Sequence, residues 1–120
     1  MADTLTAYKQ NTKIYTMTFT NSVGVAIDIT DCTIYFTIKS MESSPTVTDT
    51  NALLHKIILP AAHTTPSAGI TSMTLTNDNL NIDVGTYYFD FQMINASGEI
   101  TTLQKGVYKI LERVTLTTTV

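Results

Sequence analysis

The sequence predicts an all-β domain, an antiparallel sandwich of about seven short strands, and three observations favour that fold class. Apolar and polar residues alternate in several segments with the period of two that is typical of strands with one buried face. Turn residues separate these segments roughly every 8–12 positions, as in antiparallel sandwiches. Threonine supplies about one residue in five, and its branched Cβ favours strands over helices. A chain of 120 residues is expected to form one domain.

The first half of the chain contains two clear strands. In 14–20, Tyr15, Met17 and Phe19 alternate with threonines. After a turn and a short extended piece at 26–31, residues 32–39 show the cleanest alternation of the sequence, with every second side chain apolar. Both segments are therefore expected to bury one face.

The middle of the chain is less regular. Residues 41–50 carry Ser, Pro, Thr and Asp without periodicity and are expected to form a surface connection. Residues 52–59 fit a helix by their Leu and Ala content, but their short length and the following Pro60 favour a strand. A loop at 60–69 precedes the alternating segment 70–76, which is expected to be a strand.

The C-terminal third predicts a hairpin and a last core strand. Residues 86–94 alternate with four apolar side chains on one face, and 95–98 has the composition of a hairpin turn. We expect 99–104 to return beside the strand just completed, and 106–111 to form the last core strand.

Both ends of the chain lie outside this alternating pattern. We expect an N-terminal arm at 1–12, the sandwich at 13–113 and a C-terminal arm at 114–120. The segments 4–11 and 114–120 are nearly uncharged and prone to extended structure, so they are candidates for pairing with the sheet edges of neighbouring subunits. The candidate contact residues of the C-terminal arm are Val114, Leu116 and Val120.

The run 83–89 has the spacing of a tyrosine corner. Asp83, Gly85 and Tyr87 stand at the offsets of this motif, in which the tyrosine hydroxyl bonds to the upstream backbone. Phe89 follows two residues later, where an antibody domain has its second cysteine, so an aromatic ring would replace the disulfide. The alternative is that Tyr87 is an ordinary core aromatic after a glycine turn. The corner favours an immunoglobulin-like version of the sandwich.

Composition argues against several classes of function. A net charge of −3 with seven Lys and Arg residues provides no basic field for nucleic acid. No apolar run has the roughly 20 residues of a membrane helix, and the opening ten residues lack the regions of a secretory signal. The single cysteine, Cys32, excludes an internal disulfide and is expected to be a reduced, packed thiol. We therefore expect neither nucleic acid nor membrane as a partner.

Candidate catalytic and metal residues are few. A nucleophile elbow, a phosphate-binding glycine loop and a metalloprotease motif are all absent from the sequence. His55 and His63 lie on different segments and are expected at the surface or in loops. Oxygen donors at 79–83, with Asp90 further on, are a weak match to a calcium loop because Val84 stands where glycine is needed. Asn95-Ala96-Ser97 matches a glycosylation sequon, although the hairpin turn explains these residues. We expect no enzyme activity, cofactor or metal.

The outward strand faces offer candidate contact residues. Tyr35 and Tyr88 fall opposite the core residues of their strands and are candidate interface anchors. Alternation along the last strand projects Lys105, Lys109 and Arg113 on one side, with aliphatic residues between them. This basic stripe is either a contact surface or an ordinary solvated face.

Several segments together resemble the immunoglobulin-like domain of tailed-bacteriophage baseplate upper proteins and related small virion proteins. The similarity extends over about Leu5 to Thr115. The segments that carry it are 26–31, 33–39, 83–90, 95–98 and 105–110.

The resemblance implies a non-enzymatic structural protein of a phage virion, made in the host cytoplasm. It would mediate contacts with other virion proteins or with repeated copies of itself in the tail, baseplate or fibre apparatus, where symmetry multiplies weak contacts. Capsid decoration and a head–tail connector are alternatives within the same class. A carbohydrate-binding module is an alternative from another class, with Tyr35 and Tyr88 as its aromatic candidates. A small enzyme is the least favoured alternative.

Overall fold

The computed structural model describes residues 3–40 and 52–114, and these ranges form seven strands and two short 3-10 helices. The strands are β1 (Asp3–Tyr8), β2 (Lys13–Thr18), β3 (Thr33–Ser40), β4 (Leu54–Ile58), β5 (Ile70–Leu75), β6 (Gly85–Ile94) and β7 (Ile100–Leu111). The helices are η2 (Pro60–Ala62) and η3 (Pro66–Ala68). The expected all-β fold is confirmed. The connection expected at 41–50 lies outside the described residues.

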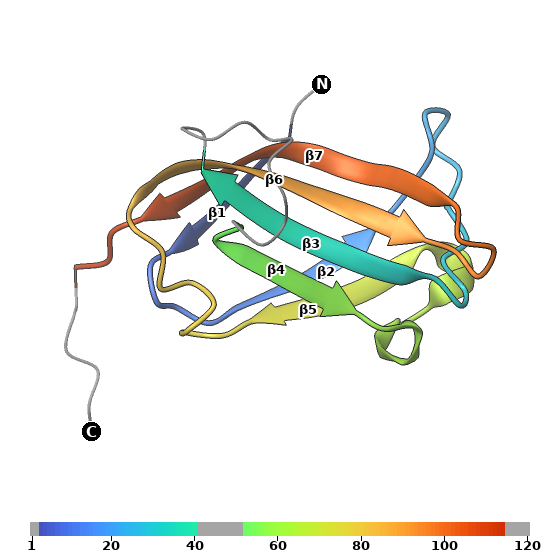
Figure 1. Ribbon diagram of the computed structural model, residues 1–120, viewed down its shortest axis with the longest axis horizontal. Helices are drawn as coiled ribbons and strands as arrows, with labels where there is room; N and C mark the ends of the chain where they lie inside the picture. Colours follow the sequence, from blue (N-terminus) through green and yellow to red (C-terminus); the bar gives the residue numbers. More distant parts are fainter. Residues whose placement is uncertain (1–2, 41–51, 115–120) are drawn as a thin grey trace.

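The strands form two sheets of unequal size. The larger sheet has the strand order β1-β7-β6-β3-β4, and β2 pairs with β5 in a two-stranded sheet. Figure 1 shows β2 and β5 together on one side of the larger sheet. All neighbouring strands are antiparallel except β1 and β7, which are parallel.

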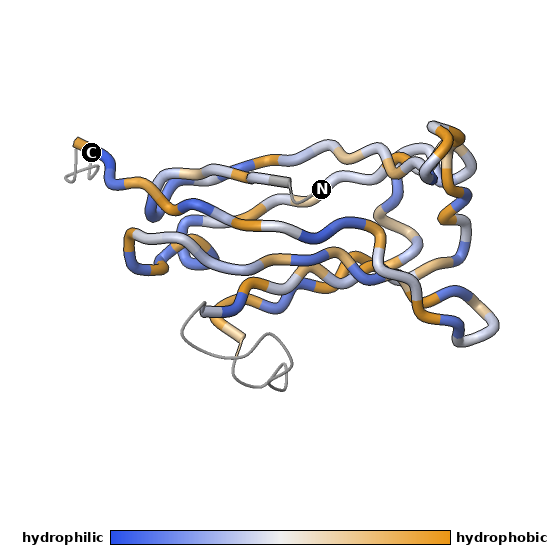
Figure 2. Tube along the Cα trace, turned by 90° about the horizontal axis from the view of Figure 1, so that it is seen from above, coloured by the Kyte–Doolittle hydropathy of each residue, from blue (hydrophilic) through white to orange (hydrophobic). Residues whose placement is uncertain are grey.

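The two sheets share one hydrophobic core. On β3 the inward residues Ile34, Phe36 and Ile38 have no exposed surface, as the alternation at 32–39 predicts. Phe91 of β6 lies 4.8 Å from Phe36 and 5.5 Å from Phe19, measured between ring centroids, so aromatic contacts join the sheets. Hydrophobic residues are interspersed with hydrophilic ones along the strands, as Figure 2 shows. None of the helices in the described ranges is long and apolar enough to cross a membrane.

The segment 52–59 contains a strand, which decides between the two structures that its composition allows. β4 pairs antiparallel with β3 and places Ile58 in the core. Its burial alternates with a period of two, and Pro60 then opens the short helix η2. In a helix, the aliphatic side chains of this segment would point in several directions. In the strand, every second side chain points to the same face and packs against one sheet.

The N-terminal segment corrects the sequence analysis. Residues that we expect to form a free arm instead form β1, which pairs with β7 of the same chain. Ala7 is buried and Leu5 packs against the core. Leu5 and Ala7 are the two apolar side chains of β1 that pack inward, and they stand among threonines. An alternation of two residues is too short a pattern to predict a strand. The N-terminal segment is therefore an edge strand of the larger sheet rather than a free arm.

The last strand is also longer than expected. The two segments expected at 99–104 and 106–111 are not separate strands, because 100–111 form the continuous strand β7 and Glu99 lies just before it. Its register against β6 shifts between Phe91 and Gln92, because Phe91 pairs with Gln104 while Gln92 pairs with Thr102. Leu103 is the extra residue of this bulge, and it interrupts the period of two that a sequence pattern depends on.

Candidate binding surfaces

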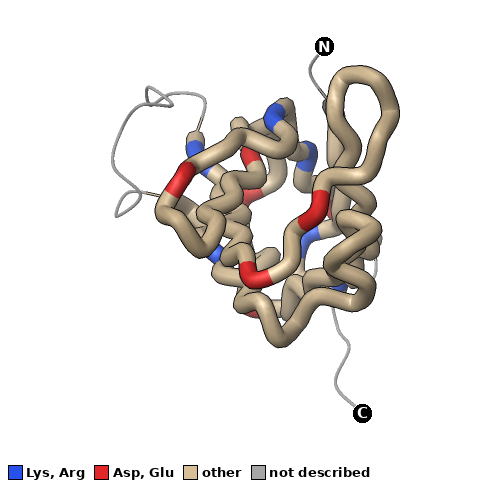
Figure 3. The backbone as a smooth tube through the Cα atoms, turned by 90° about the vertical axis from the view of Figure 1, so that its right-hand side faces the viewer, with Lys and Arg blue, Asp and Glu red and all other residues tan. Residues whose placement is uncertain are grey.

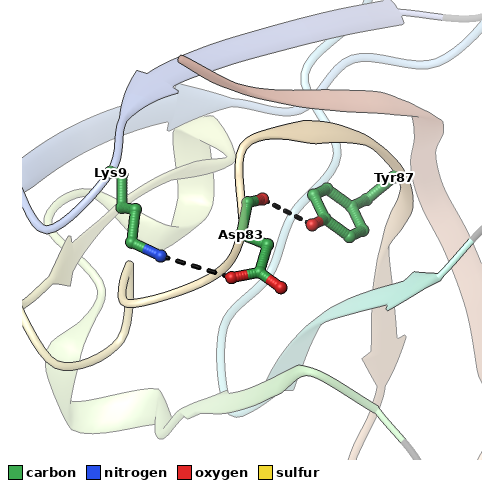
Figure 4. Close-up of polar contacts among 3 residues, drawn as sticks. All are labelled: Lys9, Asp83 and Tyr87. Atoms are coloured by element: carbon green, nitrogen blue, oxygen red, sulfur yellow. Dashed lines mark hydrogen bonds and ion pairs between the residues drawn. The ribbon is translucent and has the colours of Figure 1, made fainter. Parts of the chain in front are cut away.

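The predicted tyrosine corner has the defining hydrogen bond of that motif. The Tyr87 hydroxyl donates to the backbone carbonyl of Asp83 at 2.5 Å, while the Asp83 side chain accepts a hydrogen bond from Lys9 at 3.4 Å (Figure 4). Phe89 lies in the core, where its ring makes an edge contact with that of Tyr108. A Cβ on Gly85 would lie 3.6 Å from the Tyr87 hydroxyl, an ordinary contact, so space does not require glycine there. These residues fix the start of β6, and Asp83, Gly85 and Tyr87 also line a hollow of about 680 Å³.

The face of the larger sheet that points away from β2 and β5 contains a hollow of about 730 Å³. We call it the outer-face groove. It is lined by residues that include Tyr35, His55, Tyr88, Asp90, Gln92 and Lys105. Three of the predicted contact residues, Tyr35, Tyr88 and Lys105, are thus brought together from three strands.

Strand alternation explains which side chains reach the groove. Core residues occupy the even positions of β3 and the odd positions of β6 around Phe91, so Tyr35 and Tyr88 point outward. Register then brings distant residues together, since Tyr35 lies opposite Gln92, and Asp90 opposite Lys105. The sequence predicts the outward direction of these side chains but not their neighbours.

A fixed polar cluster occupies the middle of the groove. The Gln92 amide nitrogen donates to a carboxylate oxygen of Asp90 at 2.8 Å and to the Thr102 hydroxyl at 2.8 Å. The Thr102 hydroxyl also lies 3.1 Å from the Gln92 amide oxygen. These contacts limit the rotamers of all three side chains and place one carboxylate beside one amide. Sequence reasoning missed Gln92 and Thr102, because only the register of β6 against β7 pairs them.

Tyr35 has an aromatic neighbour at the β4 side of the groove. The rings of Tyr35 and His55 are nearly parallel, at 18° and 5.5 Å between centroids. The His55 Nδ1 atom lies 2.9 Å from the Thr37 hydroxyl. His55 is exposed, as expected, and it helps to hold the Tyr35 ring in position.

The basic stripe lies on the same outward face as the groove. Lys105 and Lys109 are exposed and Arg113 is half buried, whereas Gly106, Tyr108 and Ile110 between them are buried. None of the three basic side chains forms an ion pair within residues 3–40 and 52–114. Figure 3 shows charged positions scattered over a mostly uncharged backbone rather than gathered in one field.

The C-terminal candidates are only partly described. Val114 is 99% exposed at the end of the described range. Leu116 and Val120 lie outside the described residues.

His63 is more closely bound than a surface histidine. Its Nε2 atom donates to the Cys32 carbonyl at 2.7 Å, since a carbonyl only accepts, and its Nδ1 atom lies 2.9 Å from the Thr71 hydroxyl. Thr71 is completely buried, so His63 provides the partner for its hydroxyl. The ring therefore fastens the loop after η2 to β5, a role with no local signal in the sequence.

Cys32 and the candidate metal ligands show no reactive arrangement. The Cys32 thiol is free and buried, as expected, and burial raises its pKa, with a further contribution from the charges of Asp28 and Asp31. The side-chain oxygen of Asn79 accepts from Lys56 and from the backbone N–H of Thr76. The described ranges contain no group of three or more His, Cys, Asp or Glu side chains that could hold a metal ion.

Comparison with known proteins adds no identification. No protein-family model matches the chain, and searches of curated proteins and of solved structures give no match.

Proposed function

We propose that this chain is a non-enzymatic structural protein of a tailed-phage virion, an immunoglobulin-like module that binds neighbouring subunits in the tail, baseplate or fibre apparatus. The resemblance to baseplate upper proteins and related virion proteins suggests the setting, and it is carried by the segments 26–31, 33–39, 83–90, 95–98 and 105–110. The exposed edge of β4 suggests how the contact is made, and it is the observation on which the proposal rests.

The strand arrangement supports an immunoglobulin-like sandwich. In such domains the chain alternates between two sheets, and a tyrosine near the start of the sixth strand bonds to upstream backbone. Here β2 and β5 leave the larger sheet to form the second one, and Tyr87 lies at the start of β6 with its hydroxyl bonded to Asp83.

β4 is an edge strand with exposed aliphatic side chains in it and directly beside it, and His55 is its other exposed residue. It pairs only with β3 in its sheet, and beside it Leu53, Ile57 and Leu59 are 46%, 51% and 61% exposed. Its only charged residue, Lys56, is half buried and donates to Asn79 at 3.2 Å. Monomeric proteins commonly protect such edges with outward charges, since an open apolar edge promotes association. A neighbouring subunit that covers β4 would remove this apolar surface from water.

Charge substitution at this edge tests the contact. We expect Ile57→Lys to reduce the number of copies per purified particle, measured by quantitative mass spectrometry, because a lysine at the centre of an apolar contact would lose its hydration. Val23→Lys is the matched control, since Val23 is 79% exposed in a loop away from β4. Equal copy numbers for Ile57→Lys and the unsubstituted chain would reject β4 as the contact.

Imaging decides where in the particle the module lies. Electron microscopy of particles that carry a tagged chain would separate a tail or baseplate position from a capsid or neck position. A capsid position would replace the proposed setting with decoration, and a neck position would replace it with a connector role. Absence of the tag from every particle would reject the virion role.

A further inference from the structure

We propose that the outer-face groove binds a short, uncharged oligosaccharide. This inference goes beyond the proposed function and does not depend on it, because it rests on the side chains of the groove and not on the β4 edge. Hydrogen-bonding, apolar and charge features of the groove each restrict the ligand class.

The position of the groove means that side chains must recognise the ligand. The groove lies over β3, β6 and β7, and β3 and β6 are paired on both sides within the larger sheet, whereas β1 pairs with β7 only from Gly106 to Leu111. The backbone N–H and C=O groups of β3 and β6 are therefore already used in the ladders. A peptide that binds as an added strand needs the free backbone of an edge. The groove therefore suits a ligand that presents hydrogen-bonding groups and apolar surface together.

Hydroxyl-rich ligands match the polar groups that remain available. Within the described residues, the hydroxyls of Tyr35 and Tyr88 and the ammonium of Lys105 make no hydrogen bond to other protein groups. In the polar cluster, Gln92 uses one oxygen of Asp90 and leaves the other as an acceptor. The groove thus offers two phenol groups, a carboxylate oxygen and an ammonium. A sugar hydroxyl both donates and accepts, so it satisfies this mixture better than a ligand with only one kind of group.

Apolar surface stands beside these polar groups. The Tyr35 and Tyr88 rings are half buried, and Ile94 and Ile100 line the same groove. The His55 ring, nearly parallel to Tyr35, restrains that tyrosine before a ligand arrives. The C–H faces of sugar rings pack on such surfaces, while their hydroxyls point to the polar cluster.

Charge and volume restrict the ligand. Lys39 and Lys105 line the groove together with Asp90, which lies opposite Lys105, so the groove presents both signs of charge. The volume of about 730 Å³ falls within the range of small-ligand sites.

Titration of the labelled protein with defined sugars tests the proposal. The probes are neutral trisaccharides of glucose, galactose and N-acetylglucosamine, together with one sulfated and one sialylated oligosaccharide. We expect at least one neutral trisaccharide to shift the amide NMR signals of Tyr88, Asp90 and Gln92 in a saturable way. Binding of only the charged probes, or of none, would overturn the proposal.

Matched variants locate the site. We expect Tyr35→Ala to weaken the neutral sugar about tenfold or more, because a ring contact is lost. Tyr35→Phe keeps the ring and should weaken it less, which guards against a folding artefact. Tyr8→Ala is the control, because Tyr8 is an exposed tyrosine of β1 outside the groove. Equal loss of binding in Tyr8→Ala and Tyr35→Ala would place the ligand elsewhere.

Separate measurements distinguish failure of the sugar-binding proposal from failure of the virion role. Particle incorporation of Tyr35→Ala should equal that of the unsubstituted chain while sugar binding is lost. Reduced incorporation without any sugar binding would instead identify the groove as a subunit contact and overturn the proposal. Absence of the chain from particles would leave the NMR result intact.

Discussion

At the scale of single residues, side-chain hydrogen bonds fasten the irregular segments to the strands. The Tyr87 hydroxyl holds the chain before β6, and the two nitrogens of His63 hold the loop after η2. The described residues contain no buried side-chain nitrogen or oxygen without a partner. The His63 bonds are partly buried, so the loss of a partner there would leave a buried polar group unsatisfied, whereas the Tyr87 bond is exposed.

Tyr87→Phe tests the corner. We expect the free energy of unfolding to fall by about 1 kcal/mol, because the bond to the Asp83 carbonyl is lost while the ring remains. Urea unfolding followed by circular dichroism measures the change. Tyr8→Phe is the control, since Tyr8 is exposed on β1. Indistinguishable unfolding midpoints for the two variants would show that the corner bond contributes nothing.

Alanine substitution at Gly69 tests how closely neighbouring backbone approaches this residue. Gly69 has φ +73, and a Cβ there would lie 2.7 Å from the carbonyl oxygens of Phe19 and Ile27. Gly24 has φ +83 and no atom within 4 Å of such a Cβ. Ala at either site should cost about 1 kcal/mol from backbone strain, and Gly69→Ala should cost clearly more because two carbonyls must move. Thermal unfolding of both variants measures the difference, and equal losses would disprove the collision.

At the scale of elements, the smaller sheet is attached to the larger one by a tyrosine pair as well as by the core. The hydroxyls of Tyr15 on β2 and Tyr108 on β7 lie 2.7 Å apart. Burial raises the pKa of both phenols. The hydrogen bond from Tyr108 partly offsets this effect at Tyr15, whereas the bond to Tyr15 further raises the pKa of Tyr108. Burial between the sheets thus favours the protonated form of both phenols.

Stability should therefore fall at alkaline pH. Above the ordinary tyrosine pKa of 10.0, the unfolded chain loses phenol protons that the folded chain retains. The stabilisation is fully present below that pH and is lost as the pH rises above it. Urea unfolding between about pH 8 and pH 11 should show this loss, and Tyr108→Phe should reduce its slope. An equal slope in Tyr108→Phe and in the exposed control Tyr8→Phe would contradict the role of the pair.

At the scale of the whole molecule, low charge and open sheet edges favour association. Only 14% of the residues are charged, against about a quarter in typical domains, and β4 presents aliphatic side chains to solvent. β1 is paired with β7 of its own chain and forms the other edge of the larger sheet, so the N-terminal segment is not a free arm. Any strand exchanged between subunits would have to come from elsewhere, and the uncharged C-terminal segment 114–120 is the remaining candidate.

Truncation tests that segment. We expect a chain without residues 114–120 to fold normally, because the last strand β7 ends at Leu111, but to enter particles at a lower copy number if this segment pairs with a neighbour. Mass spectrometry of purified particles measures the copy number, and circular dichroism checks the fold. Replacement of the threonines in this segment by serine is the control, since it keeps length and polarity. Unchanged incorporation of the truncated chain would reject a role for the segment.

Local alternation is enough to predict most of the strands of this protein and the side chains that point away from the core. Residues 14–20, 32–39, 70–76 and 86–94 each show a period of two, and each contains a strand of the structure. A period of two depends only on the geometry of an extended backbone, so neighbours in sequence are sufficient to reveal it. β1 and the continuous β7 were not predictable in this way, since one pattern is short and the other contains the Leu103 bulge.

The candidate site depends on partners that are distant in sequence. Tyr35 and Tyr88 could be selected as outward aromatics, but Gln92 and Thr102 meet only through the bulged register of β6 against β7. His63 likewise reaches Thr71 and Cys32 through tertiary contacts alone. Strand order and register are set by the apolar surface that both sheets bury together in one core. A local sequence pattern does not determine this total burial. The residues thus dictate which way each side chain points, and the assembled sheets decide which side chains meet.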